Sequence, residues 1–189
     1  MKTLLIAGHP DLKNSIVNAT ILEEVAKALP TVTIRRLCEI TPDGKFDIAA
    51  EQAVLLEADL VVWQFPYHWY SLPWLMKKWL DDVWVHGFAH GSKGRLVGKK
   101  LLVSFTTGAP EAAYTGGEGA LADINHLVEA FSATAALCKL DYQGAMWLNG
   151  VSYASRDDAA AIERQRSLAR DYATKLIERI QTIYKDNIY

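Results

Sequence analysis

The first residues that suggest chemistry follow an apolar run at positions 3–7. His9 lies just after this run, and a helical pattern begins near Ser15. The first amides of a helix have no partner within it and sit at the positive end of its dipole, so this turn can hold a phosphate. Ser15, Asn18 and His9 can add side-chain donors. The alternative is that Ser15 only caps the helix.

The segment 65–73 is crowded with aromatic rings, and it follows a second apolar run at positions 60–64. Rings in a solvent-facing loop are costly unless they cover something. A flat heteroaromatic cofactor is one candidate. Burial against the rest of the protein or against a second subunit is the other.

The segment 106–114 follows a third apolar run at positions 100–105, and small residues dominate it. Small residues let backbone amides approach the edge of a ligand closely, although the segment could equally form an ordinary turn. A phosphate cup, an aromatic wall and an amide edge together describe a site for flavin mononucleotide (FMN), provided that the three loops converge.

Other nucleotide and metal motifs are missing from the chain. It contains neither GxGxxG nor GxxxxGK[ST], so the dinucleotide turn and the nucleotide P-loop have no support. Asp82, His86 and His90 are spaced four apart, but Gly87 and Gly91 interrupt the helix that would align them. We therefore expect no metal site.

The elements that must position these loops alternate along the whole chain. Apolar runs predict parallel strands buried on both faces, and amphipathic segments between them predict covering helices. The expected strands are 3–7, 32–37, 60–64, 100–105 and 142–148. The expected helices are 16–29, 47–58, 73 to about 86, a segment through 121–131, and a last helix capped by Ser155.

This alternation predicts an α/β fold with three layers, built from five strands and five helices. The flavodoxin-like strand order 2-1-3-4-5 and the Rossmann-type order are both compatible with it. In the first of these orders, strands one, three and four are neighbours, so their loops would meet at one rim.

Length and composition agree with one compact domain spanning residues 1–189. The net charge is −2, from 20 basic and 22 acidic residues, which gives no basic field for nucleic acid. Cys38 and Cys138 form no CxxC pair, which suits a reducing compartment. The apolar run 4–7 is too short for a signal segment, and we expect a cytoplasmic protein.

Several motifs resemble one known family. His9-Pro10 with Ser15 and Asn18, the stretch 64–73 leading into 75–81, and Thr106-Thr107-Gly108 resemble the flavodoxin-like NAD(P)H:quinone oxidoreductases. The stretches 47–52 and 82–89 are most similar to the ancillary oxidoreductases of glutathione-regulated potassium-efflux systems. This resemblance covers nearly the whole chain.

The resemblance implies the flavodoxin-like strand order, FMN rather than FAD, NAD(P)H as cosubstrate, and a homodimer with its site near the interface. It implies that the phosphate and ribityl chain contact His9, Ser15, Ile16, Val17 and Asn18. It places the isoalloxazine ring against Pro66, Tyr67, His68, Trp69 and Tyr70. It places Thr106, Thr107, Gly108 and Ala109 along the opposite edge.

Tyr114 stands where the quinone reductases place a tyrosine beside the substrate, so the resemblance implies a catalytic role for it. Two departures from the family pattern matter. Ala109 and Pro110 replace the second glycine of the usual Thr-Thr-Gly-Gly run and its neighbour. No titratable residue stands near Ala120, where mammalian-type enzymes carry a partner histidine, so a Tyr-His relay does not transfer.

Two classes of function follow from these observations. One is an enzyme that carries hydride from NAD(P)H to a quinone-like acceptor, with both substrates using the same slot in turn. The other is a regulatory subunit that docks on a potassium-efflux transporter at the inner face of the membrane. Electron carriage of the flavodoxin type is less favoured, because such carriers rely on strong negative charge for steering.

Overall fold

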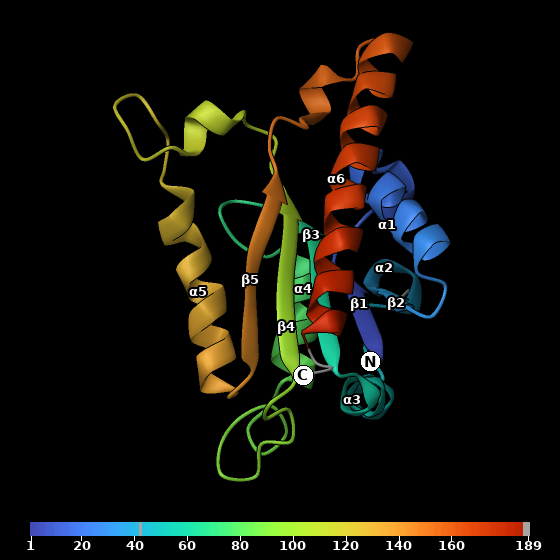
Figure 1. Ribbon diagram of the computed structural model, residues 1–189, viewed down its shortest axis with the longest axis vertical. Coiled ribbons are helices and arrows are strands. Elements are labelled where there is room, and N and C mark those ends of the chain that lie inside the picture. The colour runs from blue at the N-terminus through green and yellow to red at the C-terminus, as the bar shows by residue number, and fades with distance from the viewer. Residues whose placement is uncertain (42, 187–189) are drawn as a thin grey trace.

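The computed structural model describes residues 1–41 and 43–186. Its five strands are all parallel and lie in the order β2-β1-β3-β4-β5 (Figure 1). This is the flavodoxin-like order, and it excludes the Rossmann-type alternative. The strands are β1 (Thr3–Ala7), β2 (Thr33–Arg36), β3 (Leu60–Pro66), β4 (Lys100–Thr106) and β5 (Asp141–Leu148).

Helices cover both faces of this sheet (Figure 1). The α-helices are α1 (Val17–Ala28), α2 (Leu37–Ile40), α3 (Ile48–Glu57), α4 (Trp74–Val83), α5 (Ile124–Leu137) and α6 (Ala159–Lys185). Short 3-10 helices are η1 (Leu12–Asn14), η2 (Glu111–Tyr114) and η3 (Tyr153–Ser155).

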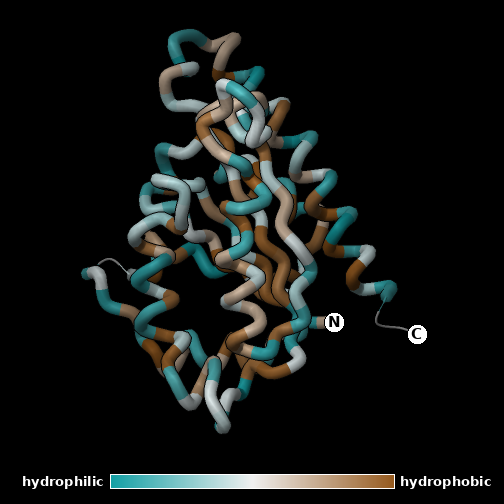
Figure 2. The backbone as a smooth tube through the Cα atoms, turned by 90° about the vertical axis from the view of Figure 1, so that its left-hand side faces the viewer, coloured by the Kyte–Doolittle hydropathy of each residue, from teal (hydrophilic) through white to brown (hydrophobic). Residues whose placement is uncertain are grey.

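The core lies in two clusters, one on each face of the sheet. Leu4 and Ile6 pack on the face covered by α3, α4 and α5, while Leu5 and Ala7 pack on the face covered by α1 and α6. Apolar residues follow one another along the central strands because both faces are buried. Figure 2 shows this apolar character along strands in the middle of the molecule.

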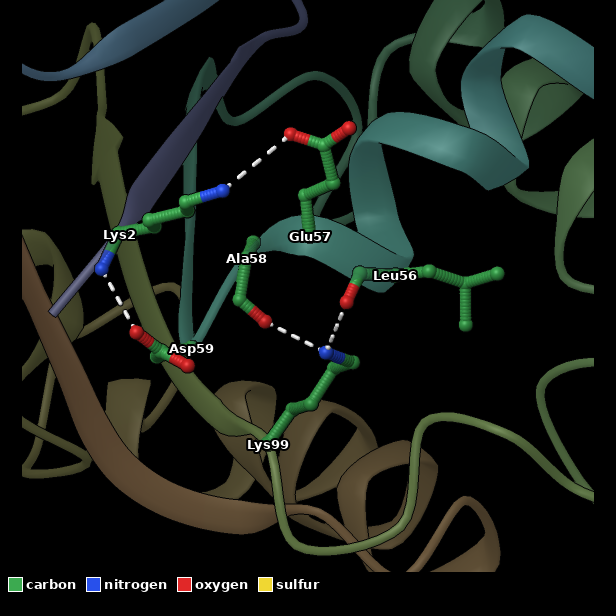
Figure 3. Close-up of polar contacts among 6 residues, drawn as sticks. All are labelled: Lys2, Leu56, Glu57, Ala58, Asp59 and Lys99. Carbon is green, nitrogen blue, oxygen red and sulfur yellow. Dashed lines mark hydrogen bonds and ion pairs between the residues drawn. The ribbon is translucent and has the colours of Figure 1, made fainter.

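Lys99 closes the end of α3 that leads into the central strand β3. Its Nζ donates to the carbonyl oxygens of Leu56 at 2.8 Å and Ala58 at 2.6 Å (Figure 3). Carbonyls at the end of a helix have no intrahelical partner, so this lysine satisfies them. The backbone amide of Lys2 donates to Asp59 at 2.7 Å, which ties the starts of β1 and β3 together.

The structure corrects two expected helix starts. The last helix begins at Ala159, because the side chain of Asp158 accepts from the Ala161 amide and makes the cap; Ser155 lies in η3. Similarly, Asp123 caps α5 by accepting from the Asn125 amide. Leu121, expected on that helix, precedes it and is exposed.

Other expected boundaries also shift. The helix expected to reach His86 ends at Val83, before Gly87 adopts a φ of 86° that helices do not tolerate. The second strand was expected over 32–37 but ends at Arg36, since Leu37 starts α2 and is buried there. The first helix, expected over 16–29, spans Val17–Ala28. Within the described residues, no helix has the length and apolar character needed to cross a bilayer.

Candidate functional site

Backbone hydrogen bonds join the segments at the carboxyl ends of the strands. The amide of Gly8 donates to Gln64 at 2.8 Å, and the amide of Tyr67 donates to Thr106 at 2.8 Å. The amide of Thr107 donates to Leu148 at 2.9 Å. The loops after β1, β3, β4 and β5 therefore form one continuous rim at the edge where open parallel sheets bind ligands.

A cavity of about 210 Å³ opens within this rim. The structure brings together there most of the side chains that the sequence singled out. These are His9, Ser15, Val17, Asn18, Pro66, Tyr67, His68, Thr106, Thr107 and Gly108.

Five other candidates lie outside the lining of the cavity. Ile16 stands at the start of α1, and Ala109 follows Gly108 along the chain. Trp69 and Tyr70 project from the rim with 93% and 46% of their surface exposed. Tyr114 is buried in the apolar cluster on the α5 face, close enough to Tyr67 to influence its ionisation.

The segment after β5 supplies a further wall that the sequence motifs did not reveal. Val151, Ser152, Tyr153 and Arg156 line the cavity, and Ser152 packs close to Gly108. The buried side chain of Gln165 on α6 holds this wall by donating to the Ser152 carbonyl at 2.8 Å. One indication of this wall is present in the sequence: its residues directly follow β5, the strand next to β4.

The turn into α1 has the free donors that an anion needs. Ser15 Oγ accepts from the Asn18 amide at 3.2 Å, which is a capping contact. The amides of Ile16 and Val17 have no acceptor among the described residues. The positive end of the α1 dipole lies at these amides, so the turn favours negative charge.

His9 is a neutral donor at this end of the cavity. Burial, reinforced by the nearby His68 and Arg156, lowers its pKa to about 4, while Asp11 opposes the shift. Its Nδ1 accepts from the Asp11 amide at 3.0 Å. The ring hydrogen of neutral His9 therefore resides on Nε2, which remains available to a ligand.

A chain of buried hydrogen bonds runs from α6 to the cavity. Tyr172 and Ser104 share a 2.7 Å hydroxyl contact, and Ser104 donates to Gln64 Oε1. Gln64 Nε2 donates to Asn18 Oδ1 at 3.0 Å, and Asn18 Nδ2 donates to Thr106 Oγ1 at 3.1 Å. The chain ends at Thr106, which lines the cavity together with Asn18.

The Thr107 hydroxyl faces inward instead. It contacts Asn149 Oδ1 at 2.7 Å and the Ala109 carbonyl at 3.1 Å, so it ties the loop after β4 to the residues after β5. Of the two adjacent threonines, only Thr106 keeps its hydroxyl hydrogen without an acceptor among the described residues.

The aromatic loop ends in a two-residue turn. The amide of His68 donates to the Ser71 carbonyl at 3.1 Å, and the amide of Ser71 donates back at 2.9 Å. The two residues between them, Trp69 and Tyr70, have φ values of 49° and 60°. Positive φ at both central positions is the signature of a type I′ turn, which normally uses Asn and Gly.

No group of three or more His, Cys, Asp or Glu side chains within 1–41 and 43–186 is placed to hold a metal ion. A larger and more open hollow of about 780 Å³ exists, but it lies at the amino ends of the strands, beside Met1, Asp59 and Lys100. Parallel sheets bind ligands at the opposite edge. The cavity behind the rim is therefore the candidate site.

The chain also resembles known proteins in sequence and in structure. A family model described as a flavodoxin-like fold matches residues 1–173. The glutathione-regulated potassium-efflux system ancillary protein KefF of an Enterobacter strain is 43% identical over 140 residues, which is 74% of this chain and 78% of that protein.

Two solved structures extend this likeness. The general stress protein 14 of Treponema denticola, crystallised in complex with FMN, is 34% identical with a TM-score of 0.81, covering 95% of this chain and 99% of its own. An NADPH-quinone reductase from P. pentosaceus is 30% identical with a TM-score of 0.73, covering 92% and 98%. The chain belongs to the family with the flavodoxin-like fold, as its motifs indicated.

Proposed function

We propose that this protein is an FMN-dependent NAD(P)H:quinone oxidoreductase. The observation that carries the proposal is the single cavity into which the loops after β1, β3 and β4 bring their candidate residues. The FMN complex of the Treponema denticola relative and the NADPH-quinone reductase relative support the same assignment.

The donors in the cavity and at the turn beside it fit a flavin phosphate. The free amides of Ile16 and Val17, the Ser15 hydroxyl and the His9 Nε2 hydrogen surround the turn into α1. A phosphate offers several acceptor oxygens and complements the helix dipole. These residues would therefore hold the phosphate end of FMN, with Asn18 keeping the turn in shape.

The other walls of the cavity suit the flat part of the cofactor. Pro66, Tyr67 and His68 line one side, and Trp69 and Tyr70 would extend this aromatic wall beyond the rim. Thr106, Thr107 and Gly108, with Ala109 next to them along the chain, would form the opposite edge of the flavin site. The Thr106 hydroxyl would donate to the polar edge of the ring.

When bound, FMN supplies hydride transfer, accepting from NAD(P)H and delivering to an acceptor. The protein must then bind the two substrates at one face, which gives a ping-pong sequence. The Tyr114 hydroxyl, which lies near Tyr67, would donate to the developing oxyanion of the acceptor.

Purified protein tests this proposal directly. We expect the preparation to be yellow, or to bind added FMN, and to oxidise NAD(P)H in the presence of quinones with parallel double-reciprocal lines. Tyr114→Phe should lower turnover and leave FMN affinity unchanged. A protein that binds no flavin would refute the proposal, and unchanged rates across a quinone series would remove Tyr114 from the reaction.

A second function is suggested by the likeness to KefF, an ancillary protein of a potassium-efflux system. We propose as an alternative that the flavin-loaded protein docks on a potassium-efflux transporter and activates it. Co-expression with such a transporter, followed by potassium-efflux measurements from cells, tests this role. Efflux that is the same with and without the protein would exclude it.

Exposed apolar side chains near the site support a homodimer as part of either proposal. Trp69 and Tyr153 lie at the rim or in the lining, and 93% and 58% of their surfaces are exposed. A second copy would cover such surfaces. We propose a cytoplasmic homodimer, and sedimentation of the purified protein with and without FMN tests its oligomeric state.

A further inference from the structure

Arg156 is held in a fixed position at the wall of the cavity. It lies between η3 and α6, and its Nη1 donates to the Asn14 carbonyl at 3.0 Å. Its guanidinium carbon lies 3.9 Å from the centre of the Tyr153 ring. Both contacts restrict the side chain, so the guanidinium is positioned before any ligand arrives.

The guanidinium lies beside the turn that has free amides. Asn14, which it contacts, comes directly before Ser15 and the unpartnered amides of Ile16 and Val17. Arg156 Nε is buried and has no hydrogen-bond partner among the described residues. A buried donor without a partner costs free energy, and a bound acceptor would recover that cost.

Arg156 is also the one permanently ionised side chain among the described residues that line the cavity. Burial lowers the pKa of His9 to about 4 and lowers the pKa of His68, so both rings are neutral at pH 7. A phosphate monoester carries roughly −1.5 to −2 charges at that pH. Without Arg156, only backbone dipoles and neutral donors would face this charge.

We propose that Arg156 binds the phosphate of the cofactor and makes the site selective for a phosphorylated flavin over riboflavin. This inference rests on the proposed FMN function. Arginine suits the role because its planar fork of donors matches phosphate oxygens and it stays charged at any physiological pH. The Tyr153 ring packs against the face of the guanidinium, and the Asn14 carbonyl accepts from its Nη1.

Equilibrium titration of the apoprotein with FMN and with riboflavin, followed by flavin fluorescence, tests this proposal. We expect Arg156→Met to weaken FMN binding by about 10- to 100-fold, as for loss of a charge-assisted hydrogen bond. Riboflavin affinity should stay within about twofold, because riboflavin has no phosphate. Arg156→Lys should fall between, since lysine keeps the charge but loses the planar fork.

Arg164→Met is the matched control, because Arg164 is exposed on α6 and does not line the cavity. It should change neither affinity. Added salt should weaken FMN binding to the wild type more than FMN binding to Arg156→Met. Far-UV circular dichroism and thermal unfolding show whether each variant is folded.

Three outcomes would overturn the inference. Unchanged FMN affinity in Arg156→Met would show that the residue does not bind the phosphate. Equal weakening of FMN and riboflavin would show that it shapes the cavity without recognising phosphate. A wild type that binds neither flavin would refute the proposed function itself, which distinguishes that failure from the first two.

Discussion

The turn 68–71 places two bulky aromatic residues in a backbone conformation that asparagine and glycine adopt more readily. Trp69 and Tyr70 both have positive φ, although Trp69 is almost fully exposed and gains little from packing. Such conformations cost about 1–3 kcal/mol each and persist where function requires them. We infer that the two rings contact a ligand or a second subunit outside this chain's own core.

Replacing the pair, Trp69→Asn with Tyr70→Gly, should therefore stabilise the protein and impair the site. We expect the free energy of unfolding to rise by about 1–2 kcal/mol, because the new residues prefer this turn. We also expect FMN and riboflavin affinities to fall together by about tenfold, through loss of aromatic contact. Urea unfolding and flavin titration measure the two effects.

Trp74→Gln is the control for this pair, since Trp74 is exposed on α4 outside the cavity lining. It should leave flavin binding unchanged. A double variant that is less stable than the wild type would contradict the turn argument, while unaltered flavin binding would contradict the role of the aromatic wall.

His9 predicts a specific dependence of stability on pH. Its folded pKa of about 4 lies below the unfolded value of 6.5, so between these values the unfolded chain binds a proton that the folded chain does not. Stability from this residue is complete above pH 6.5 and is lost as the pH falls towards 4. The full loss amounts to about 3 kcal/mol.

Urea unfolding of the apoprotein from pH 4 to pH 7, with His9→Gln as the comparison, isolates this contribution. The stability difference between wild type and variant should change in favour of the variant as the pH falls. A difference that stays constant over this range would show that His9 is not held neutral in the folded protein.

Among the elements, α6, β4, β3 and α1 are joined by the buried hydrogen bonds that end at Thr106. Gln64 lies in the middle of this chain and serves both Ser104 and Asn18, whereas Tyr172 lies at its far end. Removing a middle member leaves two buried groups unpaired, but removing the end member leaves Ser104 still bonded to Gln64.

We therefore expect Gln64→Met to lower the free energy of unfolding by about 2–4 kcal/mol and to weaken FMN binding, because Asn18 and Thr106 lose their fixed orientation. Tyr172→Phe should cost about 1 kcal/mol and leave FMN affinity unchanged. Urea unfolding and FMN titration of both variants test this order. Equal effects of the two substitutions on FMN affinity would contradict it.

The sequence predicted where the strands that are buried along their whole length begin. It did not predict helix starts where two nearby residues could each make the cap. β1 was predicted with its observed bounds, since an apolar strand covered on both faces has a plain signature. The predicted start of α6 was wrong because Ser155 and Asp158 are both good capping residues, and in the structure it is Asp158 that caps the helix. Nothing local distinguished them.

The candidate site divides in the same way. Residues in motif-bearing loops, such as Ser15 and Thr106, could be predicted to converge once the strand order was assumed. The wall formed by Ser152 and Arg156 could not be predicted from the sequence. It carries no motif, and its position depends on the packing of α6 against the segment that follows β5. The engagement of the Asn18 amide by Gln64 depends on packing across the sheet, which spacing along the chain does not encode.

At the scale of the whole molecule, two hollows lie at opposite ends of the sheet. One is the rimmed cavity at the carboxyl ends of the strands, and the other is the open hollow at their amino ends. Of these two, the cavity at the carboxyl ends combines free helix amides, a neutral histidine donor and an arginine held by two contacts. A choice by volume alone would select the hollow at the amino ends, which lacks this combination of donors.

Hydrogen exchange of the whole chain separates these two hollows. FMN at about 100 times its Kd should raise the free energy of unfolding by about 2.7 kcal/mol, because it binds only the folded state. Amides that open locally should gain protection chiefly in 8–18, 66–71, 106–109 and 151–156, where the ligand bridges the loops. Amides at 95–100, beside the larger hollow, should gain no local protection from exchange. Their protection should rise only as far as the higher global stability of the protein raises it for every amide. Protection centred on 95–100 would place the ligand at the wrong edge of the sheet, and would contradict a site built from the loops at the carboxyl ends.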